Sequence, residues 1–187
     1  MSQARRLFAA TELDSPMGLR HRAMLADLIT NGCRIGALCR LRTGDLRTHE
    51  EGRLFRFREK NGREREIPVR NDLEEWIEAY MGGAGIAEDP TTAPLWRSAL
   101  RGGSVTLRRV IEGAVRTIFK HRLAADGIPD NLTPNYFRFM IVTAVLSQNV
   151  PVEEVQHLVG CYPPSTIQLS DRWRRRVTRS IVECIPF

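Results

Sequence analysis

Apolar residues recur at helical spacing over most of the chain. The first such segment runs from Leu19 to Asn31 and is interrupted by Gly32, and a second, shorter helix is predicted from Ile35 to Leu41. Further helices are predicted from Leu73 to Tyr80, from Val105 to about Asp126, from Pro134 onward, from Val150 to Gly160, and as a last pair from Pro163 toward Arg176 and beyond. The side chains expected to cap helix N-termini are those of Asn71-Asp72, Ser104 and Thr133.

Between two of these helical segments the apolar period falls to two. LFRFR (Leu54 to Arg58) and REIPV (Arg65 to Val69) alternate in polarity, and the turn-prone Lys60-Asn61-Gly62 separates them. Leu46 to His49 is the expected third strand. The region from Gly83 to Gly103, rich in Gly, Pro and Thr, is interpreted as one long loop. The pattern therefore predicts a mainly α domain with a small three-stranded antiparallel sheet inserted early.

Composition agrees with one folded domain over residues 1–187 and adds a basic character. The 187 residues are 42% hydrophobic, which is enough to form a core, and their formal net charge is +6. Arginine far outnumbers lysine, which favours a polyanionic partner such as nucleic acid over a purely solubilising surface.

The cysteines argue against two common classes of small protein. Cys33, Cys39, Cys161 and Cys184 form no CxxC pair and stand far from the histidines in any metal-ligand spacing, so we expect reduced thiols, no metal and no cofactor. No apolar run approaches the roughly 20 residues of a membrane span, and the first residues lack the apolar core of a signal peptide. These features predict a cytoplasmic protein with no membrane partner.

One arginine stands out in the helix predicted after Thr133. In LTPNYFRFMIVTAVL, Arg138 lies between two phenylalanines at the head of an otherwise apolar run. Arginine is almost never fully buried unless it is paired, because its charge cannot be neutralised and removing its water is costly. Arg138 is therefore expected to meet an anion.

Three segments carry short motifs in order along the chain: NGCRIGALCRLRTGDL (Asn31 to Leu46), FREKNGREREIPV (Phe57 to Val69), and LTPNYFRFMIVTAVLSQNVPVEEVQHLVGCYPPSTIQLSD (Leu132 to Asp171). Together they resemble the catalytic domain of the tyrosine recombinases, the phage integrase family. In that family an arginine follows a TGLR turn, a lysine sits in a β-hairpin before R-x-x-P, and H-x-x-R leads into a helix. A nucleophilic tyrosine lies nine residues after the histidine of an LGH turn. The resemblance covers essentially the whole chain and implies the tyrosine-recombinase catalytic-domain fold.

The resemblance implies a catalytic and phosphate-binding role for three retained residues. Arg34 matches the first family arginine, Arg138 matches the arginine of H-x-x-R, and Lys60 matches the hairpin lysine. Two converging guanidiniums would hold the scissile phosphate and stabilise charge at five-coordinate phosphorus, and the lysine would give a proton to the leaving 5′-oxygen. The anion that Arg138 meets would then be a DNA phosphate. In the alternative, purely structural interpretation, the two arginines would form ion pairs inside the fold with the carboxylates of Asp45, Glu153 or Glu154.

Three other positions depart from the family. Asn135 stands where the first histidine would be, Cys161 where the second histidine or a tryptophan would be, and Ser170 where the nucleophilic tyrosine would be. An aliphatic hydroxyl is much less acidic than a phenol, whose pKa is about 10, and the serine side chain is too short to reach the phenolic position. Tyr136 and Tyr162 stand beside two of these positions without the family spacing. The resemblance therefore implies a recombinase fold without strand cleavage.

The two ends of the chain bear on how DNA would be held. Family members commonly carry a separate helical domain before this one, and Arg34 comes too early to leave room for it, so we expect no N-terminal core-binding domain in these residues. Residues 172–187 form a basic C-terminal tail, in which the expected DNA contacts are Arg172, Arg174, Arg175 and Arg176. In the family this segment often packs onto a neighbouring protomer, and a self-docked tail is the alternative.

The sequence thus predicts a DNA-binding protein of the tyrosine recombinase family, associated with site-specific recombination or its regulation. Its expected partners are double-stranded DNA and a second recombinase protomer or homo-oligomer on DNA. A bacterial or mobile-element protein, associated with the nucleoid when bound, fits this role. Two alternatives stay open: an active recombinase that uses an unorthodox or trans-supplied nucleophile, and a protein-interaction module that keeps the fold without DNA.

Overall fold

One helix, α2 (Pro16–Asn31), forms the centre of the protein. The computed structural model describes residues 15–50, 52–58, 62, 64–100, 102–125, 127, 133–160 and 182. Helix α2 begins at Ser15, whose side-chain oxygen accepts a hydrogen bond from the N–H of Gly18, and it ends at Gly32. Every residue from 23 to 31 is buried, so α2 is surrounded on all sides rather than packed along one stripe.

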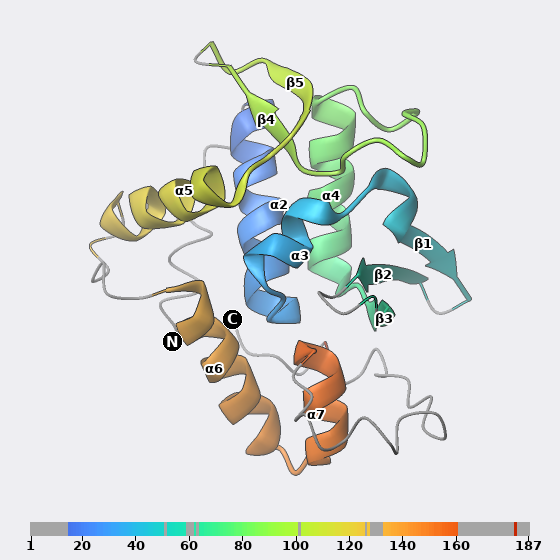
Figure 1. Cartoon of the computed structure of the whole chain (residues 1–187), viewed down its shortest axis with the longest axis vertical. Helices are drawn as coiled ribbons and strands as arrows, with labels where there is room; N and C mark the ends of the chain where they lie inside the picture. The colour runs from blue at the N-terminus through green and yellow to red at the C-terminus, as the bar shows by residue number, and fades with distance from the viewer. Residues whose placement is uncertain are drawn as a thin grey trace.

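The other α-helices of the described part of the chain pack around α2. They are α3 (Ile35–Arg40), α4 (Asn71–Gly83), α5 (Glu112–Ala125), α6 (Pro134–Leu146) and α7 (Val152–Val159). Helix α4 stands beside α2, α6 crosses the end of α2, and α7 packs on α6 (Figure 1). The predicted cap at Thr133 is confirmed, since its side chain accepts a hydrogen bond from the N–H of Tyr136. Helix α4 instead has Arg70 as its N-cap, with Asn71 as its first helical residue.

The predicted three-stranded sheet is confirmed. Strands β1 (Leu46–His49), β2 (Gly52–Arg58) and β3 (Glu64–Pro68) pair antiparallel in the order β1-β2-β3, and a 3-10 turn, η1 (Thr43–Asp45), leads into β1. The inward row of the sheet pairs Phe55 with Ile67 and Phe57 with Arg65, and all four side chains are buried. The sheet therefore turns one face to the core, as its alternating sequence predicts.

A second, two-stranded sheet corrects the prediction for residues 83–126. Strand β4 (Arg97–Ala99) pairs antiparallel with β5 (Val105–Arg109), so these residues are neither one long loop nor the start of a helix capped by Ser104. Helix α5 begins only at Glu112. The β-branched pair Val105-Thr106 follows a glycine turn, which favours a hairpin, while the helical spacing of the later apolar residues is confined to α5.

The hydrophobic core extends from α2 to the base of this second sheet. Trp96, directly before β4, is fully buried and stacks on Tyr80 of α4 with ring centroids 5.5 Å apart. Val182, near the end of the chain, is also buried in the core. Among the helices that the structure describes, none combines the length and apolar character that a membrane crossing requires.

Candidate functional site

Arg34 lies at the junction between α2 and α3, where the chain changes direction. Gly32 ends α2 in the left-handed conformation, at φ 52°, and Arg34 follows two residues later in an extended conformation as the N-cap of α3. The main-chain carbonyl of Arg34 accepts hydrogen bonds from the N–H groups of Ala37 and Leu38, at 2.8 and 3.0 Å. The backbone of Arg34 is therefore held by the first turn of α3, while the residue itself is exposed.

Arg138 comes from the first half of α6, and its side chain reaches the end of α2. Its Nη1 donates a hydrogen bond of 2.6 Å to the main-chain carbonyl of Gly32. The carbonyl end of a helix carries partial negative charge, so a guanidinium is stabilised there without a carboxylate. The second terminal nitrogen, Nη2, is buried and makes no hydrogen bond to any residue that the structure describes. Arg138 therefore keeps a donor available at this place.

The end of α7 completes the arrangement. Gly160 ends this helix in the left-handed conformation, at φ 65°, and its carbonyl accepts a hydrogen bond of 3.1 Å from Nη1 of Arg34. A methyl group on the α-carbon of Gly32 would lie 3.2 Å from Cγ1 of Val159 and 3.6 Å from Cγ of Arg138. The structure thus brings Arg34 and Arg138, which are remote in sequence, to the place where α2, α6 and α7 meet (Figure 1).

Of the other predicted site residues, the structure describes only Asn135. It is exposed in the first turn of α6, three positions before Arg138, so the two lie on the same face of the helix. The predicted residues outside the described part of the chain are Lys60, Cys161, Ser170, Arg172, Arg174, Arg175 and Arg176.

Asp45, one of the carboxylates considered for the two site arginines, is occupied elsewhere. Its Oδ1 accepts from Nε and Nη2 of Arg56, at 3.1 and 2.9 Å, and its Oδ2 accepts from Nη1 of Arg58 at 2.9 Å. The main-chain N–H of Arg42 also donates to Oδ2, at 3.0 Å. Asp45 therefore joins η1 to β2. Within the described ranges, Arg138 forms no ion pair with any carboxylate.

A further arginine, Arg65 of β3, contacts the end of α7 that anchors Arg34; its role was not predicted from the sequence, although it is the arginine of the R-x-x-P segment Arg65 to Pro68. It is fully buried and donates hydrogen bonds to main-chain carbonyls at the end of α7. The alternation of the strand could have indicated that Arg65 is buried, because Arg65 occupies the same inward row as Ile67 and Val69. No feature of the sequence marks the carbonyl groups of Gly32 and Gly160 as the acceptors of the two site arginines.

Two titratable groups beside Arg65 are shifted away from their ordinary states. Burial lowers the pKa of His157 on α7 and the charge of Arg65 lowers it further, while a hydrogen bond to the main chain of Glu66 opposes both effects. Burial also raises the pKa of Asp27 on α2 to about 7, against the hydrogen bond from Asn31 and the charge of Arg65. His157 is therefore neutral at pH 7 and adds no positive charge behind the site.

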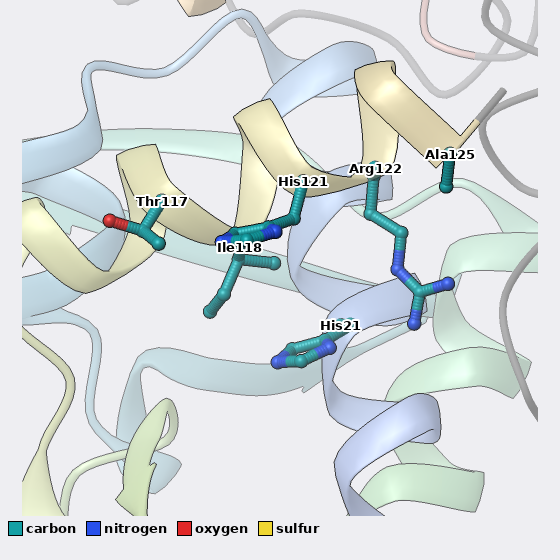
Figure 2. A pocket seen from close by; sticks show the side chains of 6 residues that line it. All are labelled: His21, Thr117, Ile118, His121, Arg122 and Ala125. Carbon is teal, nitrogen blue, oxygen red and sulfur yellow. The ribbon is translucent and has the colours of Figure 1, made fainter. Parts of the chain in front are cut away.

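A separate cavity of about 290 Å³ lies between α2 and α5. Figure 2 shows His21 of α2 facing a row of α5 side chains, of which Arg122 points toward it. The residues that line the cavity are His21, Thr117, Ile118, His121, Arg122 and Ala125. Neither Arg34 nor Arg138 belongs to this lining, so the cavity is distinct from the junction of α2, α6 and α7 where the two arginines are anchored. In the described part of the chain, no group of His, Cys, Asp or Glu is placed to hold a metal ion.

Comparison with known proteins identifies the family to which this arrangement belongs. A family model described as the phage integrase family matches residues 1–169. The chain therefore belongs to the phage integrase family, and its fold is that of a tyrosine-recombinase catalytic domain.

The curated relatives are recombinases of the same family. The chain is 26% identical over 182 residues to tyrosine recombinase XerD of Ralstonia nicotianae, a match that covers 96% of this chain and 57% of the relative. It is 27% identical over 164 residues to tyrosine recombinase XerC of Chlamydia pneumoniae, covering 85% of this chain and 49% of the relative. The chain thus spans about half the length of the curated relatives that it matches.

Solved structures share the fold at low sequence identity. The crystal structure of XerA recombinase superposes with a TM-score of 0.69 at 21% identity, over 90% of this chain and 58% of that one. XerH site-specific recombinase, bound to its difH substrate in a pre-cleavage complex, gives 0.68 at 12% identity, over 92% and 49%. A lambda integrase dimer bound to a COC′ core site gives 0.62 at 19% identity, over 92% and 47%.

Proposed function

We propose that this protein binds double-stranded DNA by its phosphates, through Arg34 and Arg138, and serves site-specific recombination or its regulation. The observation that carries the proposal is the Arg138 guanidinium, which is anchored on the Gly32 carbonyl while its buried Nη2 has no hydrogen-bond partner among the described residues. A buried cationic donor without an acceptor is costly, and a phosphate oxygen would satisfy both its charge and its hydrogen bond.

Both arginines suit a tetrahedral anion better than a single carboxylate inside the fold. Each guanidinium offers five N–H donors; one of them, on Nη1, binds the carbonyl of Gly160 in Arg34 and that of Gly32 in Arg138. The carbonyl anchors fix the direction of each side chain without neutralising its charge. A phosphate between the two side chains would accept forked hydrogen bonds from both. Lys60, Asn135 and the basic tail residues are the further contacts that we propose from the family resemblance.

We further propose that the protein does not cleave DNA by itself. A tyrosine attacks phosphorus and leaves again because its phenolate is a fair nucleophile and a fair leaving group, whereas the hydroxyl of Ser170 is too weakly acidic for either step. Cys161 and Asn135 also lack the imidazole that a histidine would supply for proton transfer at these positions. The retained arginines would then bind a scissile phosphate without an attacking group.

The relatives support DNA and a second protomer as partners of this protein. XerH is seen on its difH substrate, and lambda integrase is seen as a dimer on its core site. We propose duplex DNA and either a homo-oligomer or a second recombinase protomer for this chain, in the cytoplasm and on the nucleoid when bound.

A gel mobility shift with random duplex at low salt tests the binding. The double variant Arg34→Ala, Arg138→Ala should lose most of its affinity, because both phosphate contacts are removed. The matched control removes two surface charges that are paired with acidic residues of the helices, in Arg53→Ala, Arg116→Ala. Equal losses in the two double variants would show that net charge alone drives binding and would contradict the proposal.

A nicked suicide duplex with the ends of the protein's own element tests the absence of cleavage. On a denaturing gel we expect no covalent protein–DNA band, with or without Ser170→Ala. A band that disappears in Ser170→Ala would establish serine as the nucleophile and support the alternative of an active recombinase. A band that is lost in Tyr162→Phe or Tyr136→Phe would identify a displaced tyrosine instead.

A further inference from the structure

Arg65 occupies a position in the sheet where an apolar residue is expected. Strand β3 alternates inward and outward side chains, and Arg65 pairs with Phe57 in the inward row, one step from the pair of Ile67 and Phe55. Its side chain is 1% exposed, and its guanidinium lies over the Phe57 ring, 4.8 Å from the centroid. A charge at such a place requires fixed partners.

The partners of Arg65 lie at the end of α7. Its Nη1 donates hydrogen bonds to the main-chain carbonyls of Leu158 and, at 3.4 Å, of His157. These carbonyls belong to the last turn of α7, where a helix leaves carbonyl groups without the donors of a following turn, although the carbonyl of His157 also accepts from the N–H of Gly160 at 3.2 Å. The side chain of His157 adds a second link in the other direction, through its hydrogen bond to the main chain of Glu66 in β3. Helix α7 is thus tied to the sheet at its last turn.

The residue after this turn is the one that anchors Arg34. Gly160 follows Leu158 by two positions, and its carbonyl accepts the hydrogen bond of Arg34. A shift of the last turn of α7 against the sheet would therefore move the acceptor of Arg34. The contact between Gly32 and Val159 would change with it, because a methyl group at Gly32 would have only 3.2 Å to Cγ1 of Val159.

We propose that Arg65 is a positioning residue for Arg34: it holds the last turn of α7 against β3 and so fixes where the carbonyl of Gly160 meets the Arg34 guanidinium. An apolar side chain could fill the same space, but it could not hold the carbonyls. The charge of Arg65 also acts on the buried carboxyl group of Asp27 in α2, whose pKa it lowers against the effect of burial. The consequence for DNA affinity rests on the proposed function, while the effect on α7 does not.

Hydrogen–deuterium exchange of the free protein tests the structural part of the proposal. In Arg65→Met we expect amides of the last turn of α7 to exchange about tenfold faster than in the wild type, with α4 unchanged. In Arg65→Lys, which keeps the charge but not the forked donors of the guanidinium, the exchange rate of these amides should lie between those of Arg65→Met and the wild type. The matched control is Arg97→Met, a substitution of another buried arginine, which bonds to Pro94 and Asp89 far from α7. Equal exchange at α7 in Arg65→Met and wild type would overturn the proposal.

A double-mutant cycle on random duplex tests the functional part. Arg65→Met should weaken binding about three- to tenfold in the wild-type background, and less than about twofold when Arg34→Ala is already present. The same loss in both backgrounds, or an equal loss in Arg97→Met, would show general destabilisation and refute the positioning role. If Arg65→Met does not fold, the cycle is run with Arg65→Lys, with a smaller coupling of the same sign expected.

The two proposals fail in different ways. If Arg34→Ala leaves DNA affinity unchanged, the proposed phosphate site is wrong, and the exchange experiment alone then decides the role of Arg65. If Arg34→Ala weakens binding but the cycle is additive, the phosphate site stands and the positioning role of Arg65 is rejected.

Discussion

Arg138 of α6 is hydrogen-bonded to the main-chain carbonyl of Gly32, a residue 106 positions earlier that ends α2. Two residues after this carbonyl comes Arg34, which in turn bonds to the carbonyl of Gly160 at the end of α7. Each site arginine is therefore held by the main chain of a helix to which it does not belong. The geometry of the site depends on how three helices meet, and not on any one of them.

The first prediction concerns the dependence of DNA binding on salt. If Arg138 contacts a phosphate, Arg138→Ala should weaken binding to specific and random duplexes alike. It should also reduce the slope of log K against log salt by about one, since one fewer counterion is released. Fluorescence anisotropy between low and moderate salt measures both quantities. An unchanged slope would place the DNA contact elsewhere, with the basic tail as the first place to look.

The second prediction concerns Gly32. Gly32→Ala should lower the free energy of unfolding by about 1–3 kcal/mol, because an L-residue is strained at a positive φ and the added methyl group crowds Val159 and Ile141. DNA affinity should fall as well, since both arginines are anchored beside this residue. Urea denaturation and anisotropy are the two measurements.

Gly85→Ala is the matched control for Gly32→Ala. Gly85 also has a positive φ, of 64°, but an added methyl group there would meet no atom within 4 Å. This variant should show the backbone strain alone and bind DNA normally. Equal losses of stability in the two variants would mean that crowding at the helix junction contributes nothing.

The third prediction concerns the pH dependence of stability through Asp27. Burial raises its pKa to about 7 in the folded protein, against about 3.9 in an unfolded chain. Between these values the folded state binds a proton that the unfolded state lacks, so this contribution is complete below about pH 4 and is lost as the pH rises to 7. Asp27→Asn stays neutral and still accepts the hydrogen bond of Asn31.

Urea denaturation at pH 5 and pH 8.5 tests this prediction. Between pH 5 and pH 8.5 the difference in stability between Asp27→Asn and the wild type should shift in favour of the variant, by on the order of 1.4 kcal/mol for each pH unit between pH 5 and the folded-state pKa of about 7. Glu88→Gln, a change at an exposed carboxylate, should show no such divergence. A constant difference between Asp27→Asn and wild type at both pH values would refute the shifted ionisation.

The fourth prediction concerns Asp45. Its removal in Asp45→Ala leaves Arg56 and the N–H of Arg42 without this acceptor and leaves Arg58 paired with Glu64 alone, and should lower the free energy of unfolding by about 2–4 kcal/mol. The loss is smaller than for a fully enclosed pair because Arg58 is partly exposed to water. Asp45→Asn keeps an acceptor oxygen and should cost less. Thermal and urea denaturation measure both losses of stability. A larger loss in Asp45→Asn than in Asp45→Ala would contradict the prediction.

Local signals predicted most of the fold. Strands β2 and β3 were found because one face of each is buried, which makes the sequence alternate, and Thr133 was found because a capping side chain acts within three residues of its own position. The hairpin of β4 and β5 was missed because its partner strand lies in a stretch rich in glycine and proline. The helical spacing after Val110 also suggested an earlier helix start.

The candidate site was only partly predictable. Arg34 and Arg138 stand out by residue type and by their order along the chain, so the sequence could propose that they meet. Their acceptors could not be proposed, because every residue carries a carbonyl and only the tertiary fold selects those of Gly32 and Gly160. Arg65 was overlooked because a single arginine within an alternating strand resembles a solvent-facing charge unless its register is followed.

Main-chain anchors have a consequence for how such a site changes over generations. A carbonyl oxygen persists whatever side chain its residue acquires, so mutational drift at the surrounding positions does not remove the acceptors of Arg34 and Arg138 while the two left-handed glycines remain. A lineage can therefore exchange a nucleophile or a general acid and still inherit the same pair of cations in the same place. Ancestry and catalytic competence become separable traits in a protein built this way.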